Sequence, residues 1–270
     1  MLSGSAASLA ACDRSLNQLI GPDAELAGQL ASGLAALLDA LEASPALTRA
    51  LANPNRDKAS RQTLVRTMLA AMPTRVVDFA AQVVGQRWSQ DIELIDAVEY
   101  LAFDAALAQA ENLGLLEKVE AELFELDIYL VSHRDLRTAL GDTTASYKAK
   151  ERLLETGFGD SLEPQTLYLI KRIVKHPRGR GIRYSLKFLG DLVAARRKRL
   201  VAVVYSAQPL SQGQIAKLAA TLEDQYGQPM QLNLAVDPAT VGGLRVRVGD
   251  DVVDGTIVAR FKQLKRAVAL

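Results

Sequence analysis

Apolar residues recur every three to four positions over residues 1–199 of the 270-residue chain, which is the spacing of amphipathic helices. The clearest stripe lies between two chain breaks, Gly21-Pro22 and Ser44-Pro45, and consists of Leu26, Leu30, Leu34, Leu37, Leu38 and Leu41. A first helix is expected to begin at Ser5 or Ser8. Further helices are predicted over 45–52, 57–71, 74–87, 92–112, 115–131, 134–140, 145–156, 163–175 and 182–198.

The pattern changes after residue 199. Residues 200–205 form an apolar run of strand length, and residues 232–236 and 244–248 alternate between apolar and polar side chains, as half-buried strands do. Ser211 and Gln214 have the spacing of a capping box, which predicts a helix between the first two strands. Val252 and Val253 predict a return strand, and a last helix is expected to carry Ile257, Val258, Phe261, Leu264 and Val268.

The helical part has the pattern of an internal repeat. Leu47, Leu51 and Leu64 align with Leu136, Leu140 and Leu153 at an offset of 89, and Val84 and Val98 align with Val174 and Phe188 at an offset of 90. Chance alignment of helices rich in alanine and leucine is the alternative. We therefore predict a predominantly helical α+β protein with two tandem helical bundles, 1–99 and 100–199, and a small α/β unit over 200–270.

Composition restricts the possible chemistry. A net charge of +1 gives no overall attraction to polyanions, and a single cysteine, Cys12, excludes a disulfide framework. The two histidines, His133 and His176, are expected to be surface imidazoles. Cys12 ends a box that is similar to a lipoprotein cleavage site, but no basic residue precedes it, as a secretion signal requires. No run of about 18 apolar residues predicts a membrane span.

The charge is nevertheless uneven along the chain. Residues 100–170 carry a net charge of −7, whereas residues 171–199 carry 11 basic side chains and one acidic side chain. Such a run is typical of a solvated face or of an interface with acidic groups. The alternative function is a free helical adaptor or an RNA-binding protein that uses this 171–199 stretch, although Tyr184 and Phe188 have the spacing of core residues.

No arrangement of residues predicts catalysis. The bare Gly157-Phe158-Gly159 and Gly179-Arg180-Gly181 pairs lack the rest of a nucleotide-binding motif, and the cysteine and histidines lack a spacing that would pair them. We expect no enzyme, cofactor, metal site or direct nucleotide binding.

The C-terminal stretch carries a more specific signal. Residues 232–256, LNLAVDPATVGGLRVRVGDDVVDGT, resemble the signature of the delta subunits of F-type ATP synthases, which are related to the mitochondrial oligomycin-sensitivity-conferring protein. The family pattern has Asp-Pro, a Gly-Gly pair, Gly-Asp, and Asp-Gly-Ser before the last helix. Thr256 replaces that serine here. The junction over 194–203 and the 209–211 segment are also similar, and the extra length resembles actinobacterial delta subunits.

The resemblance implies a non-catalytic stator subunit in the peripheral stalk of a proton-translocating ATP synthase, at the cytoplasmic face of the bacterial plasma membrane. It implies that a helical bundle holds N-terminal segments of the alpha subunits and that the C-terminal unit holds the b subunit. Nucleic-acid binding and membrane insertion are not expected.

The resemblance also suggests positions for these contacts. In the family, the alpha-subunit groove lies between the first and fifth helices of the bundle, which here correspond to about 100–112 and 163–175. The expected groove residues are Phe103, Leu107, Leu167, Ile170 and Val174, with ordinary core packing as the alternative for all five. Phe261 and Leu264 are the candidates for the b-subunit contact. The residues expected to shape the fold are Gly242, Gly243, Asp254 and Gly255.

Overall fold

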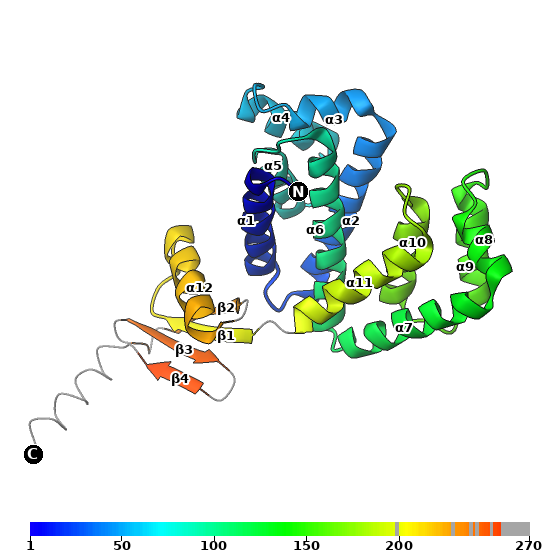
Figure 1. Cartoon of the computed structure of the whole chain (residues 1–270). Coiled ribbons are helices and arrows are strands. Elements are labelled where there is room, and N and C mark those ends of the chain that lie inside the picture. Colours follow the sequence, from blue (N-terminus) through cyan, green and yellow to red (C-terminus); the bar gives the residue numbers. More distant parts are fainter. Residues whose placement is uncertain (198–199, 228–229, 238–239, 241–242, 249–250, 255–270) are drawn as a thin grey trace, which may run out of the picture. The chain divides into compact units, whose positions relative to one another are not determined.

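The computed structural model describes residues 1–254 apart from 198–199, 228–229, 238–239, 241–242 and 249–250. The chain divides into two units, which we call the helical unit (residues 1–16 and 23–195) and the C-terminal unit (residues 17–22 and 196 onward). Figure 1 labels the elements. The first eleven helices are α1 (Ser3–Ile20), α2 (Ala24–Ala43), α3 (Pro45–Ala52), α4 (Lys58–Met68), α5 (Thr74–Val84), α6 (Asp91–Asn112), α7 (Leu116–Ser132), α8 (Arg134–Gly141), α9 (Tyr147–Phe158), α10 (Pro164–Lys175) and α11 (Ile182–Arg197).

Helix boundaries follow local side-chain chemistry. The Asp23 carboxylate accepts a hydrogen bond from the Leu26 amide at 2.9 Å and caps α2. Ser44 caps α3 in the same way, with Pro45 at the first helical position, where its missing N–H costs nothing. Gly21 has a φ of +49° in the turn before α2. The two chain breaks predicted from Gly21-Pro22 and Ser44-Pro45 are thus confirmed.

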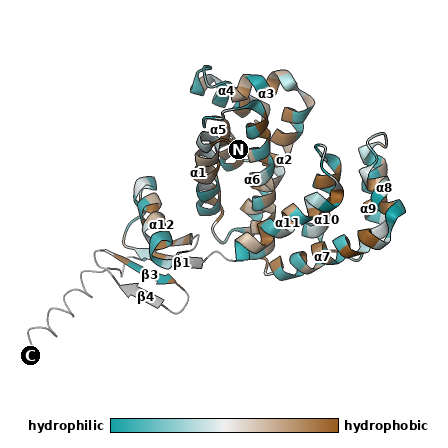
Figure 2. Cartoon of the chain, in the orientation of Figure 1, coloured by the Kyte–Doolittle hydropathy of each residue, from teal (hydrophilic) through white to brown (hydrophobic). Residues whose placement is uncertain are grey.

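The core of the helical unit is built around α2 and α6. Both helices carry many fully buried apolar side chains, and Figure 2 shows hydrophobic residues along both. Small residues let neighbouring helices approach closely: a Cβ added to Gly33 of α2 would lie 2.1 Å from Cγ1 of Val76 on α5. In addition, α6 contacts α3, α7 and α10.

Helix α10 contacts α6, α7 and α9, and α8 contacts α7. Between α7 and α10, the buried Glu122 carboxylate accepts hydrogen bonds from the Glu163 amide at 3.1 Å and from the Thr166 hydroxyl. The predicted bundle boundary at 99/100 falls within α6, which is continuous from Asp91 to Asn112. The division of the helical part into two duplicated bundles remains a prediction.

The C-terminal unit contains a four-stranded sheet with strand order β2-β1-β3-β4. Strands β1 and β2 pair in parallel, and the β1–β3 and β3–β4 pairs are antiparallel. A parallel pair needs a crossover, which α12 supplies, and the predicted Ser211–Gln214 capping box at its start is present. The elements are β1 (Leu200–Ser206), α12 (Gln212–Tyr226), β2 (Met230–Val236), β3 (Leu244–Val248) and β4 (Asp251–Asp254).

One side of this sheet forms a small core with α12. Ala202 and Val204 of β1, Leu232 of β2, and Ile215 and Leu222 of α12 are buried together. Gly243, just before β3, has a φ of +99°, a conformation that residues with a Cβ rarely adopt. The predominantly helical fold with a small C-terminal α/β unit is therefore confirmed. The predicted last helix, with Phe261 and Leu264, lies outside the described residues, as do Gly242 and Gly255.

Candidate docking sites

The five predicted groove residues lie on α6 and α10, two helices that contact each other. Phe103 and Leu107 of α6 are 3% and 0% exposed, and Ile170 and Val174 of α10 are 0% and 4% exposed. Phe103 makes an edge-to-face contact with Phe188 of α11, with 6.3 Å between ring centroids. Leu167 is half-buried. Four of these five side chains are thus buried in the core of this structure. This is the ordinary core packing that sequence analysis gave as the alternative to a groove.

A larger polar site joins α2 and α6 to the segment that begins at α10. We call it the ionic seam. Its acidic members are Asp39 and Glu42 of α2 and Asp96 and Glu99 of α6, and its basic members are Arg172, Lys175, His176, Arg178 and Arg180.

Asp39 lies at one end of the seam and accepts from three side chains. Arg172 Nη2 and Lys175 Nζ each lie 2.7 Å from its carboxylate oxygens, and His176 Nε2 lies 2.6 Å away. Burial alone would raise the pKa of Asp39, but hydrogen bonds from His176, Arg172 and Lys175 outweigh it and hold the pKa well below its usual range. Asp39 is therefore a carboxylate at neutral pH.

His176 lies between two carboxylates, because its Nδ1 atom also contacts Glu42. Burial alone would lower the pKa of the imidazole, whereas hydrogen bonds with Asp39 and Glu42 favour the charged form, and the net effect is a raised pKa. The expectation that His176 is a surface imidazole was therefore wrong. Its side chain is 12% exposed. Its partners come from α2, more than 130 residues away in the sequence.

The other end of the seam is centred on Glu99, which is 3% exposed. Arg178 Nη1 lies 2.8 Å from Glu99 Oε2, Arg178 Nη2 lies 2.5 Å from Asp96 Oδ1, and Arg180 also contacts Glu99. Arg178 has a φ of +50°, and a positive φ is uncommon in residues other than glycine. The ion pairs thus accompany a backbone conformation that is unusual at an arginine.

Most basic groups at the start of the 171–199 stretch contact acidic side chains of the same chain. Five of them belong to the seam; outside it, Lys171 contacts Glu155 at 2.5 Å and Arg183 contacts Asp127 at 2.7 Å. Phosphate binding needs accessible lysines and arginines, so these contacts disfavour the RNA-binding alternative. Sequence analysis left a solvated face and an interface with acidic groups as the two interpretations of this stretch, and it did not identify Asp39, Glu42, Asp96 and Glu99 as partners.

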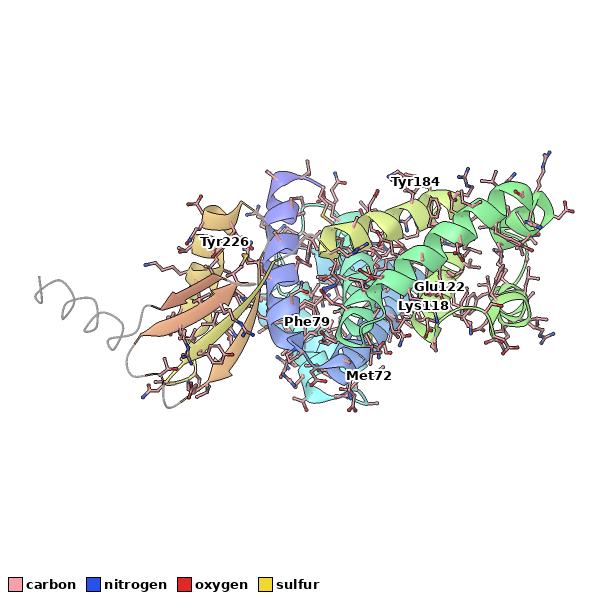
Figure 3. All side chains as sticks on the ribbon, turned by 90° about the horizontal axis from the view of Figure 1, so that it is seen from below. Met72, Phe79, Lys118, Glu122, Tyr184 and Tyr226 are labelled. Atoms are coloured by element: carbon pink, nitrogen blue, oxygen red, sulfur yellow. The ribbon has the colours of Figure 1, made fainter. Side chains whose placement is uncertain are left out.

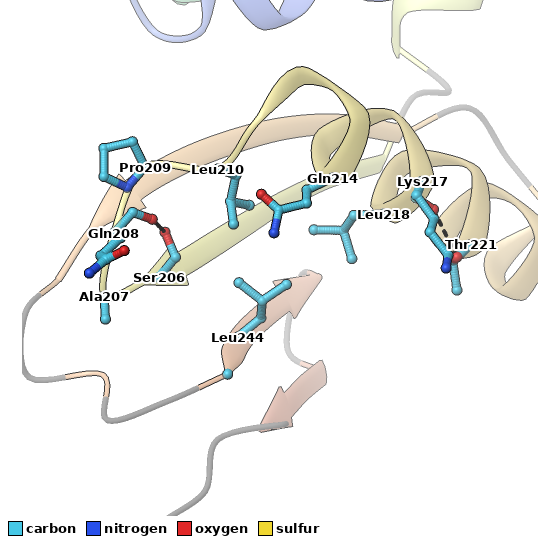
Figure 4. Close-up of a pocket in the computed structure, with 11 residues that line it drawn as sticks. Ser206, Ala207, Gln208, Pro209, Leu210, Gln214, Lys217, Leu218, Thr221 and Leu244 are labelled. Carbon is cyan, nitrogen blue, oxygen red and sulfur yellow. Dashed lines mark hydrogen bonds between the residues drawn. The ribbon is translucent and has the colours of Figure 1, made fainter.

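A separate open cavity lies in the C-terminal unit (Figure 4). It has a volume of about 710 Å³ and lies between the 206–210 loop, α12 and the start of β3. Leu210, Leu218 and Leu244 supply apolar walls. The Ser206 hydroxyl donates to the Gln208 carbonyl oxygen at 2.7 Å and fixes the loop at its rim.

The reactive side chains do not form a catalytic set. Cys12 is buried. Its burial, and to a smaller extent the negative charge of Asp13, raises the pKa of its thiol to about 12. The thiol is therefore a poor nucleophile at neutral pH. Within the described residues, no group of three His, Cys, Asp or Glu side chains is placed to hold a metal ion. Nor is any single described helix long and apolar enough to cross a membrane; the α2–α3 pair passes that test jointly but is bent by 113°.

These features define a class of protein: a helical scaffold, joined internally by an ionic seam and followed by a small α/β unit. The family model for the ATP synthase delta (OSCP) subunit matches residues 103–268. Proteins called ATP synthase subunit delta from Beutenbergia cavernae and Streptomyces griseus are 38% and 39% identical over 270 residues, the whole length of both chains. The Streptomyces lividans protein is 41% identical over 261 residues, covering 97% of this chain and 96% of its own.

The chain belongs to the ATP synthase delta (OSCP) subunit family. It is a peripheral stator subunit of the ATP synthase rather than a catalytic one. The resemblance found in residues 232–256 is thereby confirmed.

Proposed function

We propose that this chain connects N-terminal segments of the alpha subunits of the catalytic head to the b subunit of the peripheral stalk, at the cytoplasmic face of the bacterial plasma membrane. The observation that carries the proposal is the agreement with the delta-subunit family over the whole chain. A stator must resist the torque of the rotor, so its parts must hold together under load. The apolar α2–α6 contact and the ionic seam would supply that resistance within the helical unit.

The alpha-subunit site in this proposal remains the contact between α6 and α10. Amphipathic helices commonly bind by laying an apolar face into a groove between helices. Leu167 is the groove residue most accessible to a partner, while Phe103, Leu107, Ile170 and Val174 would form the floor beneath it. The b-subunit site would include Phe261 and Leu264. The plan of a first bundle over 1–99, a second over 100–199 and a C-terminal unit over 200–270 is part of the same proposal.

The test is calorimetric titration of the full chain with a synthetic peptide that has the N-terminal sequence of its own alpha subunit, at two salt concentrations. We expect saturable one-to-one binding with little salt dependence. Leu167→Asp should weaken it by about tenfold or more, equivalent to about 1.4 kcal/mol, whereas Leu153→Asp on α9, which changes another partly exposed leucine, should not. Phe103→Asp would extend the test to the floor, with circular dichroism to confirm folding.

Binding that survives both groove variants would place the alpha-subunit site elsewhere on the chain. Absence of peptide binding, combined with RNA binding that is lost as salt rises, would contradict the proposed partners and support the polyanion-binding alternative.

A further inference from the structure

One helix of the helical unit exposes an apolar face. Phe124, Ile128 and Val131 of α7 are 68%, 52% and 50% exposed. Their spacing of four and three residues places them on the same side of the helix. We call these three side chains the α7 face. The opposite side of α7, with Val119, Leu123, Leu126 and Leu130, is buried. A contiguous exposed apolar stripe of this kind marks an interaction surface more often than scattered surface residues do.

The protein contains a helix in the same register whose outer face is covered. At an offset of 89 residues, the buried apolar positions of the two helices coincide: Leu30, Leu34, Leu37 and Leu41 of α2 are buried, and so are Val119, Leu123, Leu126 and Leu130 of α7. By the same offset, Phe124, Ile128 and Val131 of α7 correspond to Ala35, Asp39 and Glu42 of α2.

The covering element on α2 is α10 together with the residue that follows it. Arg172 donates to the Ala35 carbonyl oxygen at 3.2 Å and to Asp39, and His176 contacts Glu42. The element that covers this face of α2 is thus an amphipathic helix whose basic side chains meet carboxylates of the helix below. No described element covers the corresponding face of α7, because its three apolar side chains are at least half exposed.

Charge indicates what would cover it. Helix α7 carries five acidic residues and one basic residue, Lys118, which contacts Glu163, the residue before α10. Glu120 lies one turn and Glu117 two turns before Phe124 on the same side of the helix. Figure 3 shows Tyr184, 64% exposed, on the neighbouring α11, one residue after the Arg183 that contacts Asp127 of α7. The surface is therefore apolar in the middle and acidic toward the start of α7.

We propose that the α7 face binds an amphipathic helix of a partner chain within the ATP synthase. Its apolar residues, three and four positions apart, cover Phe124, Ile128 and Val131, and its lysines or arginines lie against Glu117 and Glu120. As in the contact of α10 with α2, basic side chains of the covering helix meet carboxylates of the helix below; the middle of the α7 contact is apolar instead of ionic. In repeat-like folds a terminal face that remains in solvent is normally polar, so an apolar one is suited to a partner. This site is separate from the α6–α10 groove, and it rests on the proposed function because it requires the assembled complex.

The first experiment places a photo-crosslinking benzoylphenylalanine at position 128 of the full chain in the purified, assembled ATP synthase. The matched control carries it at position 92, where Ile92 on α6 is similarly exposed at 49%. We expect position 128, but not position 92, to capture one peptide of another subunit. Mass spectrometry should show that its apolar residues are spaced by three and four and that it has at least two lysines or arginines.

The second experiment measures binding of that captured sequence, made as a peptide, to the full chain. Phe124→Asp combined with Ile128→Asp should weaken binding at least tenfold, because it puts charges on the apolar stripe. Glu117→Lys combined with Glu120→Lys should weaken it by several-fold and remove most of its salt dependence. Ile92→Asp should leave binding unchanged. All of these side chains are exposed or near the surface, so thermal unfolding should confirm that each variant is folded.

Capture of no subunit, of a second copy of this chain, of lipid, or of a peptide without the amphipathic spacing would overturn the proposal. So would unchanged peptide binding by the Phe124 and Ile128 double variant. Titration of the same variants with the alpha-subunit peptide separates the two proposals. If the α7 variants lose the captured peptide but bind the alpha-subunit peptide normally, the α7 site stands independently of the α6–α10 groove. If they bind the captured peptide normally while the groove variants lose the alpha-subunit peptide, the α7 proposal has failed and the groove proposal stands.

Discussion

Two interfaces of α2 differ in their chemistry. Toward α6 the contact is made by leucine and alanine side chains with no solvent access, whereas toward α10 it is made by Asp39, Glu42 and their basic partners. Apolar burial is non-directional and nearly independent of pH and salt, while partly exposed ion pairs depend on both. The first interface therefore sets how stable the helical unit is, and the second sets how α10 and the residues after it are oriented on it.

The largest effect is expected at the apolar interface. Leu34→Ala removes a fully buried side chain from α2 and should lower the free energy of unfolding by about 2–5 kcal/mol, through lost burial and the cavity left behind. Urea unfolding followed by circular dichroism measures this change. Leu113→Ala, at an exposed leucine after α6, is the control. A loss at Leu34 no larger than that at Leu113 would show that this contact is not the main source of stability.

A smaller effect is expected at the buried end of the ionic seam. Glu99→Gln keeps the shape of the side chain but removes the charge that faces Arg178 and Arg180. The two arginines are partly solvated and Arg178 keeps Asp96, so we expect a loss of about 1–3 kcal/mol rather than the full cost of breaking a buried pair. Urea unfolding of this variant beside Asp191→Asn, at an exposed ion pair, measures it. Equal stabilities would contradict a structural role for Glu99.

The pH dependence of stability should arise at the other end of the seam. Because the pKa of His176 is raised in the fold, its contribution is fully present below its ordinary value of 6.5 and is lost as the pH rises through the folded value. The pKa of Asp39 is lowered, so its contribution is present above 3.8 and is lost as the pH falls through the folded value. Melting temperatures from pH 5 to pH 9 should decline above 6.5 for the natural chain and stay flatter for His176→Gln. If the melting temperatures of the two proteins declined in parallel, His176 would not be the source of the pH dependence.

The smallest effect is expected outside both interfaces. Lys187 and Asp191 form a pair one helical turn apart, 2.8 Å from Nζ to Oδ2, with both side chains mostly exposed. Such pairs contribute about 0.2–0.5 kcal/mol and are weakened by salt. Lys187→Ala should therefore change the midpoint of urea unfolding by little more than the error of the measurement. A loss as large as that of Glu99→Gln would mean that exposed pairs stabilise this chain as much as the seam does.

Much of the fold could be predicted because its signals are local. Ser44-Pro45 ends one helix and begins the next, and Ser211 with Gln214 forms a capping box, so a few neighbouring residues determine each boundary. Alternation along residues 232–236 and 244–248 identified strands β2 and β3 in the same way. Local chemistry of this kind can be recognised without knowledge of the tertiary structure.

The candidate sites could not be predicted to the same extent, because they depend on distant contacts. Helical spacing places Phe103 on an apolar face but does not indicate whether a partner or the protein's own Phe188 covers it. His176 was expected at the surface because Asp39 and Glu42 are remote in the sequence. For Phe124 and Ile128 the reverse holds: their spacing resembles that of core residues, and only the structure reveals that they are exposed.

The continuity of α6 has a mechanical consequence. With 22 residues and a rise of about 1.5 Å per residue, it is a rod about 33 Å long, and its sides contact α2 and α3 as well as α7 and α10. It cannot unravel while either group of neighbours stays in place. When the chain is stretched from its two ends, the helices around α6 should therefore unfold together in one event at a single force. The helical unit should not unfold in two separate steps.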